Sequence, residues 1–66
     1  MPRVRVEWLT GRTHEQRRRL VELLTNAVVE VARVEPDAVS IVFVETPREL
    51  QAKGGVLWSE MTEAEP

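Results

Sequence analysis

The chain has 66 residues, no cysteine, one histidine and a formal net charge of −2. A chain of this length forms one small domain, residues 1–66, and buries only about 60% of the surface that its unfolded form exposes. Without cysteine it has neither a disulfide nor a thiolate metal site, and a single histidine does not make a zinc site. The negative charge gives no reason to expect nucleic acid as a partner.

The short length also bears on assembly and location. Oligomerisation is the usual support for so small a core when disulfides and metals are missing, so we expect more than one copy. No apolar run approaches the ~20 residues that span a membrane, and the N-terminus alternates like a strand instead of forming a secretory signal. We therefore expect a cytoplasmic protein without a membrane partner.

The first predicted element is a strand over residues 2–9. Val4, Val6 and Trp8 point to one side of it, and the charged residues between them point to the other. Such alternation predicts a strand with one buried face. Trp8 continues that face, so we expect it in the core or in an interface.

Pro2 stands directly before this strand and after Met1. An initiator methionine before a small residue is commonly removed, and removal here leaves a secondary amine at the terminus. A free α-amino group titrates at roughly 7.7–8.0, and burial or nearby cations lower its pKa. Such an amine is able to act as a general base. Taken alone, however, Pro2 is better explained as a residue that only permits removal of Met1 or starts an edge strand.

Gly11 then turns the chain, and a helix is predicted from about His14 to near Arg33. Thr13 and Gln16 fit a capping box at its start. Apolar residues recur at helical spacing and form one stripe. They are Leu20, Leu24, Ala27, Val28 and Val31.

The arginine run at residues 17–19 is predicted to be a solvated face of this helix. Glu15 with Arg19, and Arg18 with Glu22, are spaced as i,i+4 ion pairs. Negative charges interleaved with positive ones are typical of a face in water, and not of a surface for an anionic partner.

The second strand is predicted over residues 39–44. This run is apolar and β-branched except at Ser40, which suits a strand covered on both faces, as in a parallel sheet. Strand, helix and strand in this length form a βαβ unit with a right-handed crossover. Further on, Gly54-Gly55 predicts a tight turn, and residues 60–66 are polar and expected to form a flexible tail.

The apolar residues of the second strand need two covering surfaces. Val42 and Val44 fall on one face, and Ile41 and Phe43 on the other. The helix covers one face, so another subunit must cover the second. The short apolar segment 56–58 is also able to add an edge strand to a neighbour's sheet.

Together these features resemble the tautomerase superfamily, of the short 4-oxalocrotonate tautomerase type, over roughly residues 2–58. The matching segments are Met1-Pro2, Leu9-x-Gly11-Arg12-Thr13-x-Glu15-Gln16, the helix through Leu20 and Ala27, Val44-Glu45, and Gly54-Gly55-x-Leu57. The resemblance implies an α/β fold of the tautomerase type, with one βαβ protomer and a short C-terminal hairpin or strand. It also implies dimers with four-stranded sheets, assembled as a hexamer of three dimers.

The resemblance further implies an isomerase that needs no cofactor and no metal. Such an enzyme moves a proton between carbon and oxygen of an unsaturated 2-oxo or 2-hydroxy acid. Pro2 matches its catalytic base, and Arg12 matches the arginine that binds a substrate carboxylate and stabilises the enolate. Leu9, Ser40 and Leu50 fall at substrate-binding positions.

Two positions depart from the family pattern. Ser40 stands where a second arginine contacts the other end of a dicarboxylate. The aromatic wall of the family pocket falls near Leu50-Gln51, and no aromatic residue stands at the matching position. Trp58 and Phe43 are candidates to compensate, although a core or interface position explains both better. Arg48 and Lys53 are candidates to replace the lost cation, although a solvated loop position explains both better. The departures concern the dicarboxylate substrate more than the type of reaction.

Two alternatives to this isomerase stay open. One is a protein that keeps the fold, lacks the activity and serves as an assembly or binding module. The other is a related enzyme that performs hydration, dehalogenation or decarboxylation, and for hydration Glu7, Glu45 and Glu49 are candidates to position water. Met1 bears on every enzyme reading, because a retained Met1 acylates the Pro2 nitrogen and abolishes base catalysis.

Overall fold

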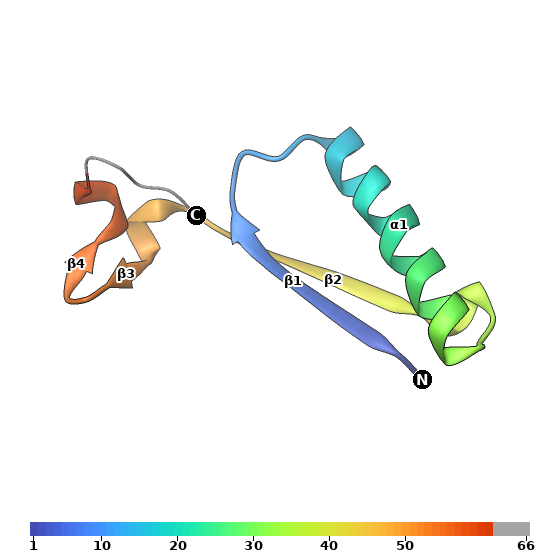
Figure 1. The fold of residues 1–66 in the computed structure, drawn as a ribbon. Helices are drawn as coiled ribbons and strands as arrows, with labels where there is room; N and C mark the ends of the chain where they lie inside the picture. Colours follow the sequence, from blue (N-terminus) through green and yellow to red (C-terminus); the bar gives the residue numbers. More distant parts are fainter. Residues whose placement is uncertain (62–66) are drawn as a thin grey trace.

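The computed structural model describes residues 1–61. Its helix and strands are β1 (Arg3–Leu9), α1 (His14–Ala32), β2 (Ser40–Thr46), β3 (Ala52–Lys53) and β4 (Val56–Leu57). Strands β1 and β2 run parallel and α1 connects them, which confirms the predicted βαβ unit (Figure 1). No helix within the described residues is long and apolar enough to cross a membrane.

The register of the parallel sheet shows which residues face the helix. It pairs Val6 with Phe43 and Trp8 with Glu45. Paired residues on neighbouring strands point to the same side of a sheet. Because Glu45 forms an ion pair with Arg17 of α1, this side is the one that the helix covers.

The opposite face of the sheet is uncovered within the protomer. It carries Val42 and Val44 from β2, as the alternation predicted, beside the exposed charged residues of β1. Strand β2 runs to Thr46, two residues beyond the predicted end at residue 44. The extension brings Glu45 into the paired part of the β1–β2 sheet, opposite Trp8.

Local chemistry explains both ends of α1. The side chain of Thr13 accepts a hydrogen bond from the Gln16 N–H at 3.1 Å, and the Gln16 side chain accepts one from the Thr13 N–H at 2.8 Å. This is the predicted capping box. At the other end Arg33 adopts the left-handed conformation, with φ 59° and ψ 49°, and its N–H donates to the Val29 carbonyl at 2.9 Å.

The half-buried stripe of α1 differs from the prediction in its second half. Ala27 and Val31 are exposed, Val31 at 83%, although both were expected to face the sheet. The stripe consists of Arg17, Leu20, Val21, Leu24, Thr25, Val28 and Val29. Ala27 and Val31 lie on the flank of this stripe, where they line a shallow apolar groove with Val28 and Ala32.

The arginine run is also arranged differently from the prediction. Arg18 lies 3.5 Å from Glu15, and Arg19 lies 3.4 Å from Glu22, so the pairs are spaced i,i+3 instead of i,i+4. Arg17 is not part of a solvated face. It lies on the half-buried stripe and reaches across to β2, and the expectation of a solvated run was wrong for it.

The C-terminal part forms a small antiparallel hairpin of β3 and β4. Gly54 and Gly55 make its turn with φ 63° and 84°, which confirms the predicted turn. Residues Trp58–Glu60 then form one 3₁₀ turn. The rest of the expected tail, residues 62–66, lies outside the described residues.

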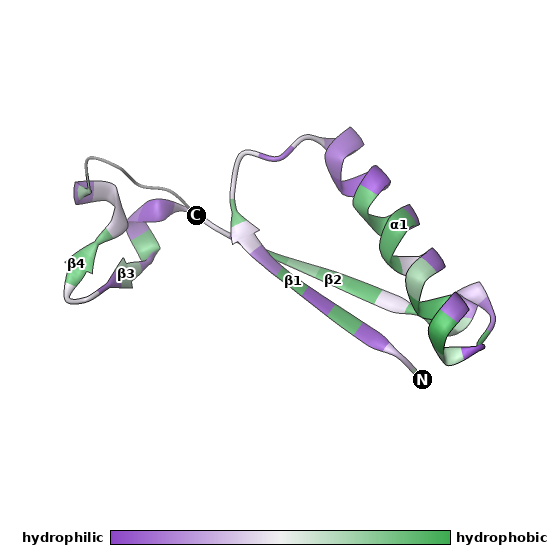
Figure 2. Cartoon of the chain, in the orientation of Figure 1, coloured by the Kyte–Doolittle hydropathy of each residue, from purple (hydrophilic) through white to green (hydrophobic). Residues whose placement is uncertain are grey.

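No residue in the described part of the chain is fully buried. The radius of gyration is 15.2 Å, whereas a compact chain of this length has about 11 Å. The hairpin lies beyond the sheet at the end opposite the N-terminus (Figure 1), and hydrophobic residues run along β2, β4 and much of α1 (Figure 2). The protomer therefore leaves apolar surface that it does not cover itself.

Candidate active site

The predicted site residues fall into two groups at opposite ends of the parallel sheet. Pro2 and Ser40 lie together at the start of the two strands, where the Ser40 N–H donates to the Pro2 carbonyl at 3.1 Å. Leu9 ends β1, Arg12 lies in the loop that follows, and Leu50 lies beyond the end of β2. The seven residues of β1 span about 23 Å, so one protomer does not bring Pro2 and Arg12 together.

The Pro2 end holds a cation that was not among the predicted site residues. Pro2 is half-buried and Met1 before it is 92% exposed. The Arg3 Nη1 atom donates to Ser40 Oγ at 3.5 Å, because Arg3 and Ser40 are partners in the parallel register. Alternation in the sequence identified Arg3 only as a solvent-facing charge, and the strand register is what places it beside Ser40.

The backbone on both sides of Arg12 is fixed. Thr10 N–H donates to the Thr46 carbonyl at 3.2 Å, which ties the end of β1 to the end of β2. Gly11 before Arg12 has φ 114°, a backbone conformation that residues with a Cβ atom rarely adopt. Thr13 after it caps the helix. Arg12 is thus the single residue between a glycine turn and a helix cap.

The Arg12 side chain lies on the indole of Trp8. Its Cζ atom is 5.1 Å from the centroid of the Trp8 ring, a distance typical of a cation–π contact. Its Nε atom is buried and has no hydrogen-bond partner among residues 1–61. Within the same residues no carboxylate lies at ion-pair distance from Arg12, so its charge is not neutralised by direct pairing.

Trp8 is itself held by two neighbours. Its ring stacks on Phe43 with centroids 5.2 Å apart and 14° between the planes. Its Nε1–H donates to Glu45 Oε2 at 2.7 Å. The expectation that Trp8 lies in the core or an interface did not include this hydrogen bond, which the extended end of β2 makes available.

Glu45 is bound from the other side by Arg17. Arg17 Nε donates to Oε2 at 2.7 Å and Nη2 donates to Oε1 at 2.8 Å, a bidentate pair. Hydrogen bonds from Arg17 and then Trp8, with attraction by Arg17 and Arg12, lower the pKa of Glu45 to about 2 against the opposing effect of burial. The hydrogen bond to Glu45 is also the main reason why the pKa of Arg17 is raised.

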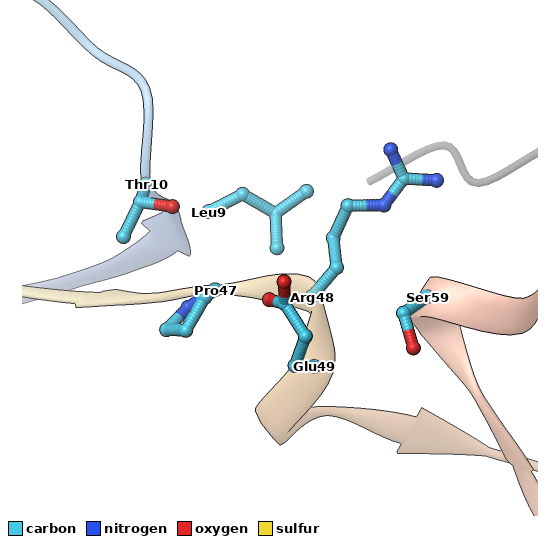
Figure 3. Close-up of a pocket in the computed structure, with 6 residues that line it drawn as sticks. All are labelled: Leu9, Thr10, Pro47, Arg48, Glu49 and Ser59. Carbon is cyan, nitrogen blue, oxygen red and sulfur yellow. The ribbon is translucent and has the colours of Figure 1, made fainter.

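A cavity of about 460 Å³ opens at the end where Leu9 lies. Its lining residues are Leu9, Thr10, Pro47, Arg48, Glu49 and Ser59. In Figure 3 the side chains of Leu9 and Arg48 approach each other across it, with Glu49 beneath them. Leu9 also lines a neighbouring hollow of about 290 Å³ with Trp8 and Trp58. Leu50 is at the same end but 71% exposed.

The three carboxylates that were candidates to position water lie in different surroundings. Glu7 pairs with Arg5 at 2.7 Å in an exposed position, and Glu45 is occupied by Arg17 and Trp8. Glu49 lines the cavity with Leu9. Lys53 lies in β3 of the hairpin, and Arg48 is the one of the two candidate cations that lines this cavity.

Comparison with known proteins identifies this arrangement of elements. The sequence model described as "Tautomerase enzyme" matches residues 2–61. The 2-hydroxymuconate tautomerase of Bacillus subtilis strain 168 is 38% identical over 61 residues, which cover 92% of this chain and 98% of the relative. A crystal structure of a 4-oxalocrotonate tautomerase homologue has a TM-score of 0.86 at 32% identity, covering 96% of this chain and 100% of that chain. A chain of the heterohexameric 4-oxalocrotonate tautomerase from Chloroflexus aurantiacus has a TM-score of 0.82 at 28% identity, covering 92% and 98%. The protein has the 4-oxalocrotonate tautomerase fold and belongs to the tautomerase family.

Proposed function

We propose that this chain is a cofactor-independent keto–enol tautomerase of unsaturated 2-oxo or 2-hydroxy acids. In this proposal removal of Met1 frees the Pro2 nitrogen, which acts as the general base. Family membership and the relative named 2-hydroxymuconate tautomerase support this class of reaction. The substrate is a small carboxylate.

The observation that carries the proposal is the Arg12 guanidinium, whose buried Nε atom has no acceptor among residues 1–61 and is free for a carboxylate. The separation of this cation from Pro2 determines how a complete site forms. Pro2 with Ser40 and Arg12 with Leu9 lie at opposite ends of β1, about 23 Å apart along the strand. A complete site therefore needs the Pro2 end of one protomer beside the Arg12 end of another. The uncovered face of the sheet, on which Val42 and Val44 lie, provides a reason for protomers to associate.

We further propose a homohexamer of three dimers as the assembly that joins the two ends. One of the structural neighbours is described as a heterohexamer, so hexameric assembly occurs in this fold. Light scattering at micromolar concentration is expected to give the mass of six chains. A stable folded monomer at that concentration would contradict both the assembly and the shared site.

The proposed reaction transfers one proton in two steps. The Pro2 nitrogen takes the proton of the 2-hydroxyl group, and the resulting negative charge spreads over the oxygen and the conjugated carbon chain. The protonated nitrogen then returns the proton to carbon, which forms the ketone. Arg12 binds the carboxylate through its planar fork and stabilises the charge that develops next to it.

The proposed substrate has one carboxylate. Among the described residues, the Ser40 hydroxyl and the exposed Arg3 beside it are the polar side chains in contact at the Pro2 end. The hydroxyl does not neutralise a charge, and attraction by an exposed arginine is weakened by water. We therefore expect a monoacid enol such as phenylenolpyruvate to react as well as the diacid 2-hydroxymuconate.

A mixing experiment tests the shared site. Pro2→Ala and Arg12→Ala chains are each expected to have little activity on phenylenolpyruvate. After both are unfolded together and refolded, random assembly places an intact Pro2 beside an intact Arg12 in about one quarter of the sites of a symmetric oligomer. Activity should return to about that fraction of the wild-type value.

The controls distinguish the proposal from its alternatives. An intact mass must show that Met1 is absent, because a preparation that keeps Met1 has no free Pro2 nitrogen. If mixing restores nothing while both variants assemble, the site is not shared between protomers. If the wild-type protein without Met1 has no activity on any enol acid, the chain is better described as an assembly or binding module.

A further inference from the structure

We propose that Trp8, Glu45 and Arg17 are positioning residues that hold Arg12 as an unpaired cation, ready for the carboxylate of the substrate. The inference rests on the proposed function, because it takes Arg12 as the anchor of that carboxylate. The sequence predicted none of these roles: Trp8 supports Arg12, Glu45 holds the Trp8 ring, and Arg17 occupies Glu45.

The task of Trp8 is to support the guanidinium group without using its donors. Arg12 Cζ lies 5.1 Å from the ring centroid of Trp8, and stacking on Phe43 and the hydrogen bond to Glu45 hold that ring. A cation over an aromatic face is attracted by the ring quadrupole and forms no hydrogen bond with it. The contact therefore orients Arg12 and leaves its N–H groups for an anion.

The Nε atom of Arg12 gives a second indication of a ligand. It is buried and finds no acceptor in the part of the chain that the structure describes. A buried donor without an acceptor is unfavourable. A carboxylate that approaches the edge of the guanidinium supplies the missing acceptor in the fork geometry that arginine prefers.

The task of Arg17 is to keep Glu45 from pairing with Arg12. Glu45 is close enough to Arg12 for that cation to help lower the pKa of its carboxyl group, yet the two do not form an ion pair. Both oxygens of Glu45 are already taken, one by Arg17 alone and the other by Arg17 and Trp8. Because Glu45 is neutralised in this way, the charge of Arg12 remains available to the substrate.

This division of tasks predicts rescue by a second substitution. In Arg17→Met the carboxylate of Glu45 is released and competes with the substrate for Arg12, so KM for phenylenolpyruvate should rise about tenfold or more, with a smaller change in kcat. In Arg17→Met/Glu45→Gln no anion is left to compete, and most of the lost affinity should return. A pair that only holds the site in shape predicts instead that Glu45→Gln alone raises KM, because either single substitution breaks the pair.

A matched control and two substitutions of Trp8 complete the test. Arg18→Met removes an exposed arginine of the same helix that does not contact Glu45, and its KM should stay at the wild-type value. Trp8→Leu removes the aromatic face and should raise KM about two- to thirtyfold. Trp8→Phe keeps a ring and should raise KM less. Light scattering on each variant confirms that it assembles.

The outcomes separate this inference from the proposed function. If the double variant is as impaired as Arg17→Met, or if Trp8→Leu leaves KM unchanged, the positioning roles are wrong. If Arg17→Met does not assemble, Glu45→Gln alone decides. Glutamine keeps an acceptor for the Trp8 N–H and removes the charge, so the inference predicts an unchanged or lower KM and a structural pair predicts a higher one. If Arg12→Ala itself leaves kcat/KM unchanged, Arg12 is not the anchor, and the proposed function fails at that residue.

Discussion

The Ser40 N–H donates to the Pro2 carbonyl at 3.1 Å, so the proposed base is joined at the start of the parallel sheet to the residue that departs from the family pattern. The contact extends the β1–β2 ladder by one hydrogen bond toward the N-terminus. It fixes the direction in which the chain leaves the sheet, and with it the place where a free Pro2 nitrogen lies.

Pro2→Ala is expected to lower kcat/KM for phenylenolpyruvate about a hundred- to ten-thousandfold, the range associated with a lost general base. Alanine leaves a primary amine that is more flexible than the proline ring and differs in proton affinity. Wild-type kcat/KM should rise with pH through the pKa of an essential group near or below neutrality. Full activity in Pro2→Ala, or in protein shown by mass to retain Met1, would contradict the assignment.

Ser40→Arg is expected to improve kcat/KM for the diacid 2-hydroxymuconate and to leave the monoacid nearly unchanged. A charge-assisted contact is worth about 1.5–3 kcal/mol, which is about ten- to over a hundredfold in rate. Arg3→Ala is the matched variant, since Arg3 is the cation that contacts Ser40. A wild-type protein that already prefers the diacid by several hundredfold, and loses this preference in Arg3→Ala, would show that Arg3 has replaced the missing arginine.

The ion pair of Glu45 predicts how stability changes in acid. The pKa of Glu45 is about 2 in the folded chain, below the usual 4.5, so the native state favours the ionised form. This contribution is complete above pH 4.5 and is lost as the pH falls toward 2. The difference in unfolding midpoint between the wild type and Glu45→Gln should shrink over that range. A difference that stays constant down to pH 2 would show that the charge of Glu45 does not stabilise the fold.

Arg33→Gly is expected to stabilise the protein by about 0.5–1 kcal/mol, because the left-handed conformation strains a residue with a Cβ atom and glycine adopts it freely. Arg33 has φ 59° and is exposed. Thermal unfolding at a fixed chain concentration measures the change. Glu30→Gly, inside the exposed face of the same helix, is the control and should destabilise. A lower midpoint for Arg33→Gly would mean that its side chain makes a contact that outweighs the strain.

Most of the backbone was predictable because local chemistry determines it. The cap at Thr13, the end of the helix near Arg33 and the turn at Gly54-Gly55 each depend on residues a few positions apart, and the structure confirms all three. The two-residue period of side chains along a strand likewise identified the two faces of β2. Such patterns are sufficient to predict the backbone wherever residues close in sequence determine its conformation.

The side-chain network of the site was not predictable in the same way. Arg17 and Glu45 are separated by 28 positions, and Trp8 and Glu45 by 37. Spacing on the helix alone favoured solvated pairs for the whole arginine run. The choice of Arg17 follows from the register that places Glu45 beside Trp8 and from the side of α1 that faces the sheet, which no local pattern contains.

The lack of any fully buried residue among residues 1–61 has a thermodynamic consequence. If most apolar burial takes place between chains, the folded state is favoured by mass action, and its melting temperature rises with protein concentration. Substitutions on the uncovered face, such as those at Val42 or Val44, should then act as changes in affinity: severe in dilute protein and mild in concentrated protein. Dilution alone should then unfold the protein.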